Sequence, residues 1–525
     1  MESYDTSVRA ALLRLEPSRG AKAYGRSVVS AHDRPFCLYE RRALPRARQN
    51  FQSEVIDVLP INPTVLKFGG TSVEDASAFR RAAEIVRGQK AAQLAVVVSA
   101  MSRVTDALLD AVRAACAGEA GRMSDVLSEH FKRHERTARE LLPVAEAAAF
   151  VATLEQARLG LDFLLQEIAA QSTLAPALQD EVVAYGERLS ADLLAAVLRA
   201  EGVAARYVDA RHCIITDEQY GCAVPLMEDT TRQTQLLAGA LVENGEVPVM
   251  GGFIAATKEG RTTTLGRGGS DYSAALVGAA LGAREIQIWT DVSGVLAADP
   301  RVVPSAKTIS RLSYAEAAEL AYFGAKVLHP KTILPAIVRG IPVRICNSRA
   351  LLEPGTSIYF DTEMSPRTVK AIAHKIGIHI MHVTSARMLG AYGFLRALFE
   401  VFDRHRTVVD LVTTSEVSVS LSFEDTSALE AICRDLGEIG AVKVEHDRAL
   451  ICVVGEGLRN TPGVAARVFT AVRDINVMLI SQGASSINLT FVVEEAAAAR
   501  AVRQLHRAFF EQDTSELYRT AMLES

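Results

Sequence analysis

Between residues 61 and about 360, short apolar runs rich in β-branched residues alternate with helical patterns. Thr64–Phe68 and Leu94–Val98 are bounded by turn residues, as buried strands are. Further strand candidates are Val247–Val249, Glu285–Trp289 and Ile341–Ile345. Strands separated by helices favour a mainly parallel sheet that is covered by helices on both faces. Ligands bind such sheets beyond the carboxyl ends of the strands, so we expect the functional residues there.

The last third of the chain contains an internal repeat. Residues 393–423 recur without a gap at 463–493, so that Gly393 matches Gly463 and Phe399 matches Phe469. Both copies read as a helix, a strand, a turn and a second strand. A duplicated module of about 70 residues explains the repeat best. The alternative is a chance similarity between two amphipathic helices that are each followed by strands.

Composition narrows the class of protein. With 525 residues, of which 49% are hydrophobic and 23% charged, the chain is predicted to be an ordinary globular protein of three or four domains. No apolar run approaches the ~20 residues that cross a bilayer. A net charge of −5 gives no basic field for nucleic acid. Seven scattered cysteines without a CxxC pair indicate free thiols in a reducing compartment, and we expect a cytoplasmic protein.

The first 50 residues differ from the rest. They hold ten lysines and arginines against five acidic residues, and they lack the apolar core of a secretory signal. A transit peptide stays open, although such peptides avoid acidic residues. We expect residues 1–60 to be a disordered basic extension, or the product of a start codon assigned too early.

Two glycine-rich turns suggest anion binding. KFGGTS at 67–72 places a lysine at the end of a strand and two glycines in the following turn, but in the reverse order of a Walker A motif. LGRGGSD at 265–271 leads into a helix, for which we expect Ser270 or Asp271 as the N-cap. Backbone amides in such turns bind phosphate, and an arginine binds carboxylate or phosphate in a bidentate manner. Simple tight turns are the alternative.

Three single residues are further candidates for the site. Glu187 lies on the apolar stripe of a helix, where it is either half of a buried salt bridge or a contact for a substrate ammonium. Asp291 follows a strand at its carboxyl end. Lys326 is either a solvated lysine or a phosphate ligand.

Together these motifs resemble the aspartate kinases. The resemblance rests on KFGGTSV at 67–73, GE at 186–187, TTTLGRGGSDY at 262–272, WTD at 289–291, DPR at 299–301 and FGAKVLHP at 323–330. It covers about residues 61–525, and the repeated module resembles a tandem pair of ACT domains. VDLVTTSEVS at 409–418 is similar to the lysine-sensitive, single-function subgroup. The chain ends soon after the second module, so we expect no homoserine dehydrogenase half.

The resemblance implies an α/β fold of the amino acid kinase type, with a mainly parallel sheet sandwiched by helices. Two βαββαβ, ferredoxin-like ACT domains would follow it. The expected division is an extension at 1–60, a catalytic domain at 61–362, and ACT domains at 370–445 and 446–525.

The implied reaction is ATP-dependent phosphorylation of the side-chain carboxylate of L-aspartate to 4-phospho-L-aspartate. It would be the first step towards lysine (through diaminopimelate), threonine and methionine. A carboxylate with a pKa of about 4 is already ionised at pH 7, so the reaction needs no general base. It needs cations and amides that bring two anions together and stabilise the phosphoryl charge. Mg²⁺ is expected with ATP, and we assign it no protein ligand.

The resemblance also assigns residues. For catalysis it implies Lys67, Asp271 and Arg267. For aspartate it implies Ser72, Thr105, Glu187, Phe253, Arg267 and Ser270. For the nucleotide it implies Lys67, Gly69, Gly70, Thr290, Asp291, Leu296, Arg301, Lys326 and Val327. Leu296 stands where relatives commonly carry a tyrosine, which puts that contact in doubt.

Regulation is implied by the repeated module. We expect a homodimer or homotetramer through the ACT domains, with lysine as an inhibitor. The implied lysine site comprises Met388, Gly393, Phe394, Leu395, Val409, Asp410, Thr414, Ser415 and Glu416. Ala391 replaces the serine usual at its place, and Asp410 and Glu416 could alternatively be residues that merely end strands.

Two other functions stay open on the sequence. One is a kinase of the same fold that acts on another substrate, such as N-acetylglutamate or UMP. The other is an amino-acid sensor without catalysis, although the intact Lys67, Glu187, Arg267 and Asp271 argue against it.

Overall fold

The computed structural model describes residues 62–89, 93–171, 174–324, 328–360, 368–390 and 392–511. The basic extension expected at residues 1–60 lies outside the described residues. No helix in the described ranges combines the length and the apolar character that crossing a membrane requires.

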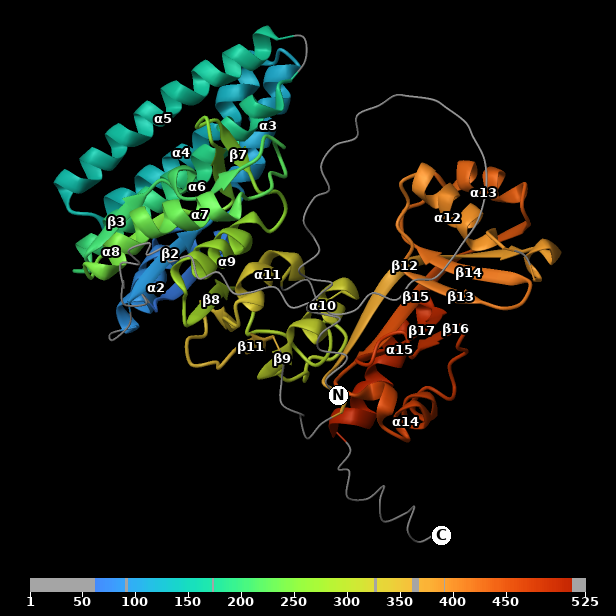
Figure 1. Ribbon diagram of the computed structural model, residues 1–525. Coiled ribbons are helices and arrows are strands. Elements are labelled where there is room, and N and C mark those ends of the chain that lie inside the picture. The colour runs from blue at the N-terminus through green and yellow to red at the C-terminus, as the bar shows by residue number, and fades with distance from the viewer. Residues whose placement is uncertain are drawn as a thin grey trace, which may run out of the picture. The chain divides into compact units, whose positions relative to one another are not determined.

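The centre of the first half is an eight-stranded sheet (Figure 1). Its spatial order is β3 (Ala205–Val208), β5 (Val247–Gly251), β2 (Leu94–Val98), β1 (Thr64–Phe68), β8 (Glu285–Thr290), β10 (Val343–Asn347), β11 (Thr356–Tyr359) and β9 (Arg311–Ser313). All neighbouring strands are parallel except β10 and β11. The predicted, mainly parallel sheet is therefore confirmed.

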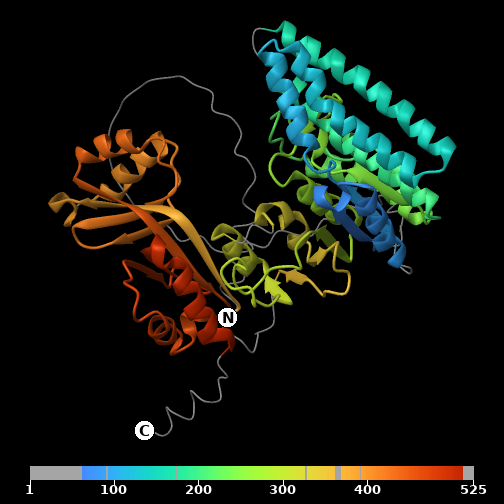
Figure 2. The same ribbon diagram turned by 180° about the vertical axis from the view of Figure 1, so that it is seen from behind.

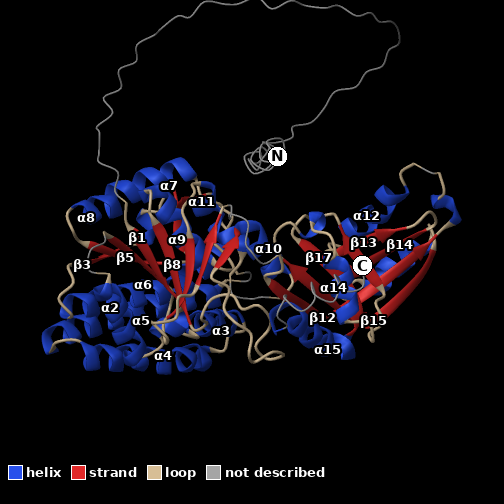
Figure 3. Cartoon of the chain, turned by 90° about the horizontal axis from the view of Figure 1, so that it is seen from below, coloured by secondary structure: helices blue, strands red, loops and turns tan. Residues whose placement is uncertain are grey.

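Helices cover both faces of this sheet, as Figure 3 shows. One layer holds α2 (Ala76–Gly88), α3 (Val104–Cys116), α4 (Ala120–Leu141), α5 (Val144–Ala170) and α6 (Pro176–Ala200). The other holds α7 (Met227–Thr234), η3 (Gln235–Gly239), α8 (Ala240–Glu243), α9 (Gly269–Leu281), α10 (Tyr314–Tyr322) and α11 (Pro330–Val338). Successive side chains of a strand point to opposite faces, so Leu66 and Phe68 join the core under the first layer and Val65 the core under the second.

A small sheet of β4 (Ile215–Thr216), β6 (Ile254–Thr257) and β7 (Thr262–Thr264) leads the chain into α9. Short turns of helix lie at η1 (Gly70–Val73) and η2 (Ala210–His212). Strand β7 ends directly before the second glycine-rich turn, so it delivers that turn to the site.

The second half forms a six-stranded antiparallel sheet, drawn in orange and red in Figures 1 and 2. Its order is β13 (Leu411–Thr414), β14 (Ser418–Phe423), β12 (Ala371–Thr384), β15 (Ala441–Val454), β17 (Asn488–Glu494) and β16 (Leu479–Gln482). Its helices are α12 (Phe394–Arg404), α13 (Leu429–Gly437), α14 (Val464–Ala471) and α15 (Glu495–His506), with short turns η4 (Ala386–Met388), η5 (Leu458–Asn460) and η6 (Arg507–Glu511). Elements α12, β13 and β14 recur as α14, β16 and β17, in line with the repeat.

Strands β12 and β15 run through both modules. The start of β12 pairs Ala371 with Val454 and Lys375 with Leu450, beside β17 of the second module. After a register shift near Ile378, the rest of β12 pairs with β14 of the first module. The sheet is therefore continuous across the two modules.

Candidate active site

Four parallel strands of the central sheet end at one edge, and backbone hydrogen bonds tie their turns together. The Gly69 N–H donates to the Trp289 carbonyl at 3.1 Å, which joins the turn after β1 to the end of β8. The Ser99 N–H donates to the Phe68 carbonyl at 3.0 Å, and the Gly252 N–H to the Val98 carbonyl at 2.8 Å. The turns after β1, β2, β5 and β8 are therefore joined at the edge of the sheet where the site is expected.

The first glycine-rich turn and the second meet through an ion pair. The Lys67 Nζ lies 2.7 Å from the Asp271 Oδ1, and the two side chains are only 11% and 15% exposed. The expected N-cap at Ser270 or Asp271 is wrong, because α9 begins at Gly269 and Gly268 occupies the cap position. The glycine takes a φ of +73° there, which L side chains rarely adopt. Asp271 thus lies inside the first turn, and its carboxylate pairs with Lys67.

Glycines allow the β5 turn to pack tightly on the start of α9. A Cβ on Gly252 would lie 2.6 Å from the Cβ of Ser270, and one on Gly269 would lie 2.7 Å from the Cδ2 of Phe253. Phe253 itself has a φ of +68°, and its N–H donates to the Ser273 Oγ at 2.9 Å. The turn that carries Phe253 therefore packs directly on the start of α9, where Ser270 lies.

Glu187 projects from α6 into this region as a buried carboxylate. It is 3% exposed, and burial raises its pKa from 4.5 to about 8, against hydrogen bonds from the Ala100 backbone and the Thr105 side chain. Its Oε2 has no hydrogen-bond partner among the described residues. An oxygen without a partner favours a contact to a ligand cation over an internal salt bridge. Thr105, which is also predicted to contact aspartate, donates a hydrogen bond to this carboxylate.

The remaining aspartate-site predictions differ in their surroundings. Ser72 is 1% exposed, and its hydroxyl oxygen lies within hydrogen-bond distance of the Trp289 carbonyl at 3.2 Å and of the Ser348 Oγ at 3.0 Å. Arg267 is exposed, in the turn between β7 and α9. Its guanidinium is therefore accessible to an anion.

The nucleotide-site predictions follow the end of β8. The Thr290 Oγ1 donates to the Asp291 Oδ1 at 3.2 Å, while Leu296 is half-buried. Arg301 is largely exposed and pairs with Asp299 at 2.6 Å. Lys326 and Val327 lie outside the described residues.

The predicted lysine-site residues surround the first repeat. Gly393 caps α12 with a φ of +82°, and Met388, Phe394 and Val409 pack against the core of this module. Leu395, Thr414, Ser415 and Glu416 are exposed. The Asp410 carboxylate accepts a hydrogen bond from the Tyr322 hydroxyl of α10 and lies 3.3 Å from the Lys375 Nζ. Ala391 lies outside the described residues.

Sequence reasoning missed the polar contacts that join distant segments. Nothing in the sequence around Tyr322 or Lys375 predicted their contacts with Asp410, since tyrosine and lysine are also common at solvated positions. Asp180 did give one, because it precedes Glu187 by seven residues and thus lies on the same face of α6. In the described ranges, no group of three or more histidine, cysteine, aspartate or glutamate side chains could hold a metal ion.

The fold defines a class: an α/β protein with a mainly parallel sheet between two layers of helices, followed by an antiparallel sheet. Residues 62–347 match the amino acid kinase family, and residues 451–509 match an ACT domain. Lysine-sensitive aspartokinase 3 of Escherichia coli is 38% identical over 85% of this chain and 99% of that protein. Chloroplastic aspartokinase 3 of Arabidopsis thaliana is also 38% identical, over 86% of this chain and 82% of that protein.

Solved structures agree with this result. The crystal structure of E. coli aspartokinase III with aspartate and ADP matches this chain with a TM-score of 0.71 and 35% identity. The match covers 86% of this chain and 100% of the E. coli chain. Its complex with lysine and aspartate has a TM-score of 0.72 and 36% identity. The chain belongs to the amino acid kinase family and, within it, is an aspartate kinase.

Proposed function

We propose that the enzyme transfers the γ-phosphoryl group of ATP to the side-chain carboxylate of L-aspartate, giving 4-phospho-L-aspartate. The ion pair of Lys67 and Asp271 between two glycine-rich turns carries this proposal. A related crystal structure that contains aspartate and ADP supports it. The reaction would be the first step towards lysine, threonine and methionine, in the cytoplasm.

The substrate pocket is proposed from complementary charges. The Glu187 carboxylate would bind the α-ammonium of aspartate, and Arg267 would bind its α-carboxylate in a bidentate manner. Phe253, Ser270, Thr105 and Ser72 would line the pocket. The side-chain carboxylate of the substrate would then be directed towards Lys67.

The phosphoryl group would be held by Lys67, with Asp271 fixing the lysine in place. Amides of the Gly69 and Gly70 turn and of the start of α9 supply further donors for phosphate. The attacking carboxylate is ionised and needs no base, so positioning and charge stabilisation provide the catalysis. Thr290, Asp291, Leu296, Arg301, Lys326 and Val327 would hold the rest of the nucleotide.

Mg²⁺ would accompany ATP. This cation is usually held by one or two carboxylates, by water and by substrate phosphates. Bound there, Mg²⁺ would neutralise phosphate charge.

Regulation is proposed through the ACT modules at 370–445 and 446–525, which follow the catalytic domain at 61–362. Lysine would bind the first module, with Asp410 or Glu416 as a partner for one of its amino groups, and a homodimer or homotetramer would form through these modules. Support comes from the related structure that contains lysine and aspartate. Effector coupling of this kind is typically worth ~1–3 kcal/mol.

A hydroxamate assay that depends on ATP and aspartate tests the reaction, because hydroxylamine traps the acyl phosphate. ADP release measured with N-acetylglutamate or UMP in place of aspartate tests the alternative substrates. We expect activity with aspartate but not with N-acetylglutamate or UMP, and we expect added lysine to inhibit this activity. Activity with another substrate instead, or with none, would contradict the proposal.

A further inference from the structure

Helix α6 carries two buried carboxylates on one face. Asp180 is 1% exposed and Glu187 is 3% exposed, and their separation of seven positions corresponds to about two helical turns. Glu187 faces the proposed aspartate pocket. Asp180 has no place in the reaction derived above, although burying a carboxylate is costly unless it is fully hydrogen-bonded.

Asp180 holds two loops at once. Its Oδ2 accepts hydrogen bonds from the Gly221 N–H at 2.8 Å and the Thr264 N–H at 2.9 Å. Its Oδ1 accepts one from the Thr264 Oγ1 at 3.0 Å. Burial raises the pKa of this carboxyl, and these three bonds oppose that rise. One side chain therefore fixes the end of β7 and the loop around Gly221.

The two loops also contact each other, close to Arg267. The Ala223 N–H donates to the Thr264 carbonyl at 2.9 Å. Gly266 has a φ of +74°, and a Cβ on it would lie 3.2 Å from the Gly221 carbonyl oxygen. Arg267 is three residues beyond Thr264. Its backbone therefore extends from the segment that Asp180 anchors.

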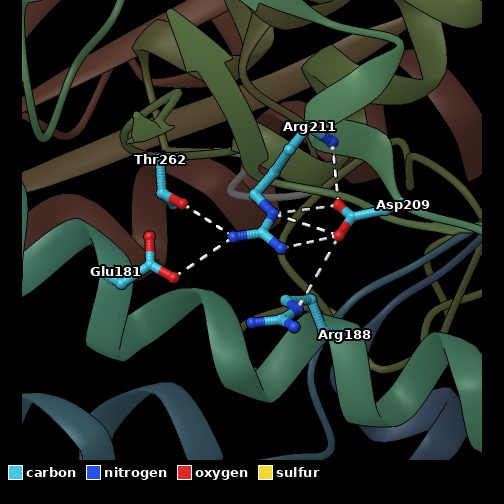
Figure 4. Close-up of polar contacts among 5 residues, drawn as sticks. All are labelled: Glu181, Arg188, Asp209, Arg211 and Thr262. Carbon is cyan, nitrogen blue, oxygen red and sulfur yellow. Dashed lines mark hydrogen bonds and ion pairs between the residues drawn. The ribbon is translucent and has the colours of Figure 1, made fainter. Parts of the chain in front are cut away.

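The neighbouring residue of α6 anchors the other end of the same strand (Figure 4). The Glu181 carboxylate lies 3.2 Å from the Arg211 Nη1, which donates to the Thr262 Oγ1 at 2.9 Å. Asp209 holds the same guanidinium at 2.8 Å. Thr262 lies two positions further from Arg267 than Thr264 does, so the Thr262 contact is a matched control for the Thr264 contact.

We propose that Asp180 is a positioning residue of the aspartate site. By anchoring Thr264 and Gly221 to the helix that carries Glu187, it sets the spacing between the Glu187 carboxylate and the Arg267 guanidinium. That spacing selects α-amino acids, whose ammonium and carboxylate groups share one carbon. The inference rests on the proposed roles of Glu187 and Arg267.

Steady-state kinetics of Asp180→Ala test the inference. Small displacements of a binding group can cost up to ~100-fold, so we expect the KM for aspartate to rise by at least about tenfold while the KM for ATP changes less than about twofold. Asp180→Asn should restore most of the affinity. Its amide oxygen can accept both N–H bonds while its NH₂ group donates to the Thr264 hydroxyl.

Two valine variants provide the matched control. Thr264→Val and Thr262→Val each remove one buried hydroxyl from the same strand, and Thr262 has no assigned part in binding. We expect Thr264→Val to raise the KM for aspartate, and Thr262→Val to lower only the melting temperature. If Asp180→Ala does not fold, the two valine variants still test the inference.

Two results would overturn the inference alone: a folded Asp180→Ala with unchanged KM for aspartate, or equal effects of the two valine variants on that KM. A wild-type chain that does not phosphorylate aspartate would instead overturn the proposed function, and the inference with it.

Discussion

The Nζ of Lys370, the residue directly before β12, lies 2.8 Å from the Glu316 Oε2 of helix α10, and both side chains are buried. The same oxygen accepts the Ser313 N–H at 2.8 Å, in a capping box at the start of α10. One carboxylate thus caps a helix of the catalytic part and pairs with a lysine next to β12. Apolar side chains of α10, β12 and β15, among them Leu320, Ala373 and Cys452, share one core with this region.

The first prediction concerns this pair. Lys370→Met leaves the Glu316 carboxylate buried without its cation, and such a loss costs about 3–5 kcal/mol. Urea denaturation should show a lower free energy of unfolding. The double variant with Glu316→Leu should recover part of the loss, since it buries no unpaired charge. Equal stability of Lys370→Met and the wild type would show that the pair contributes nothing.

The second prediction is that Lys67→Ala abolishes turnover but leaves the fold intact. Removal of a preorganised group from the developing phosphoryl charge typically costs ~10²–10³ in kcat. Circular dichroism and kcat at saturating substrates check both parts. Lys258→Ala, which removes an exposed lysine paired with Asp229, is the control and should keep normal activity. A kcat within a factor of ten of the wild type would rule out the proposed role of Lys67.

The third prediction is a pH dependence set by Glu187. Its pKa of about 8 means that the carboxyl is mostly protonated at pH 7 in the free enzyme. Aspartate binding needs the ionised form, so kcat/KM for aspartate should rise about tenfold per pH unit below pH 8 and then level off. Glu187→Gln should flatten this profile and raise the KM for aspartate far more than that for ATP. Equal changes in both KM values would favour a purely structural role.

The free energy of unfolding should fall as the pH rises towards 8, whereas kcat/KM for aspartate should rise over the same pH range. Because the folded-state pKa of Glu187 lies above its value of 4.5 in the unfolded chain, the folded state binds the extra proton. Its contribution to stability is complete below pH 4.5 and is lost as the pH rises towards about 8. Glu187→Gln should therefore be more stable than the wild type at neutral pH. A Gln variant that is clearly less stable would contradict this sign.

The fourth prediction concerns lysine. Activity should fall as lysine is added, and Asp410→Ala should weaken this inhibition. Asp410 also accepts a hydrogen bond from Tyr322, so Tyr322→Phe is the control: it removes only the hydroxyl and should keep lysine inhibition. Inhibition of Asp410→Ala as strong as that of the wild type would place the lysine site elsewhere.

Local patterns in the sequence were enough to predict much of the fold. Alternating runs such as Thr64–Phe68 indicated a parallel sheet because buried strands and the helices between them are encoded by neighbouring residues. The glycine turn after Lys67 was found in the same way, and so was the repeat, since period and turn residues are local properties. The predicted N-cap of α9 was wrong, because a side-chain cap was expected at Ser270 or Asp271. The helix instead begins after Gly268, which adopts a left-handed conformation at the cap position and makes no side-chain hydrogen bond there.

Tertiary structure alone decided which distant groups meet. The pairing of Lys67 with Asp271, the three bonds of Asp180 and the contact of Asp410 with Tyr322 each join segments that are far apart in the chain. The same holds for β12, whose first residues pair within the second module. Such contacts depend on the packing and strand register of whole elements. A short sequence pattern specifies the conformation of its own segment, whereas its partner is set by the shape of the folded chain.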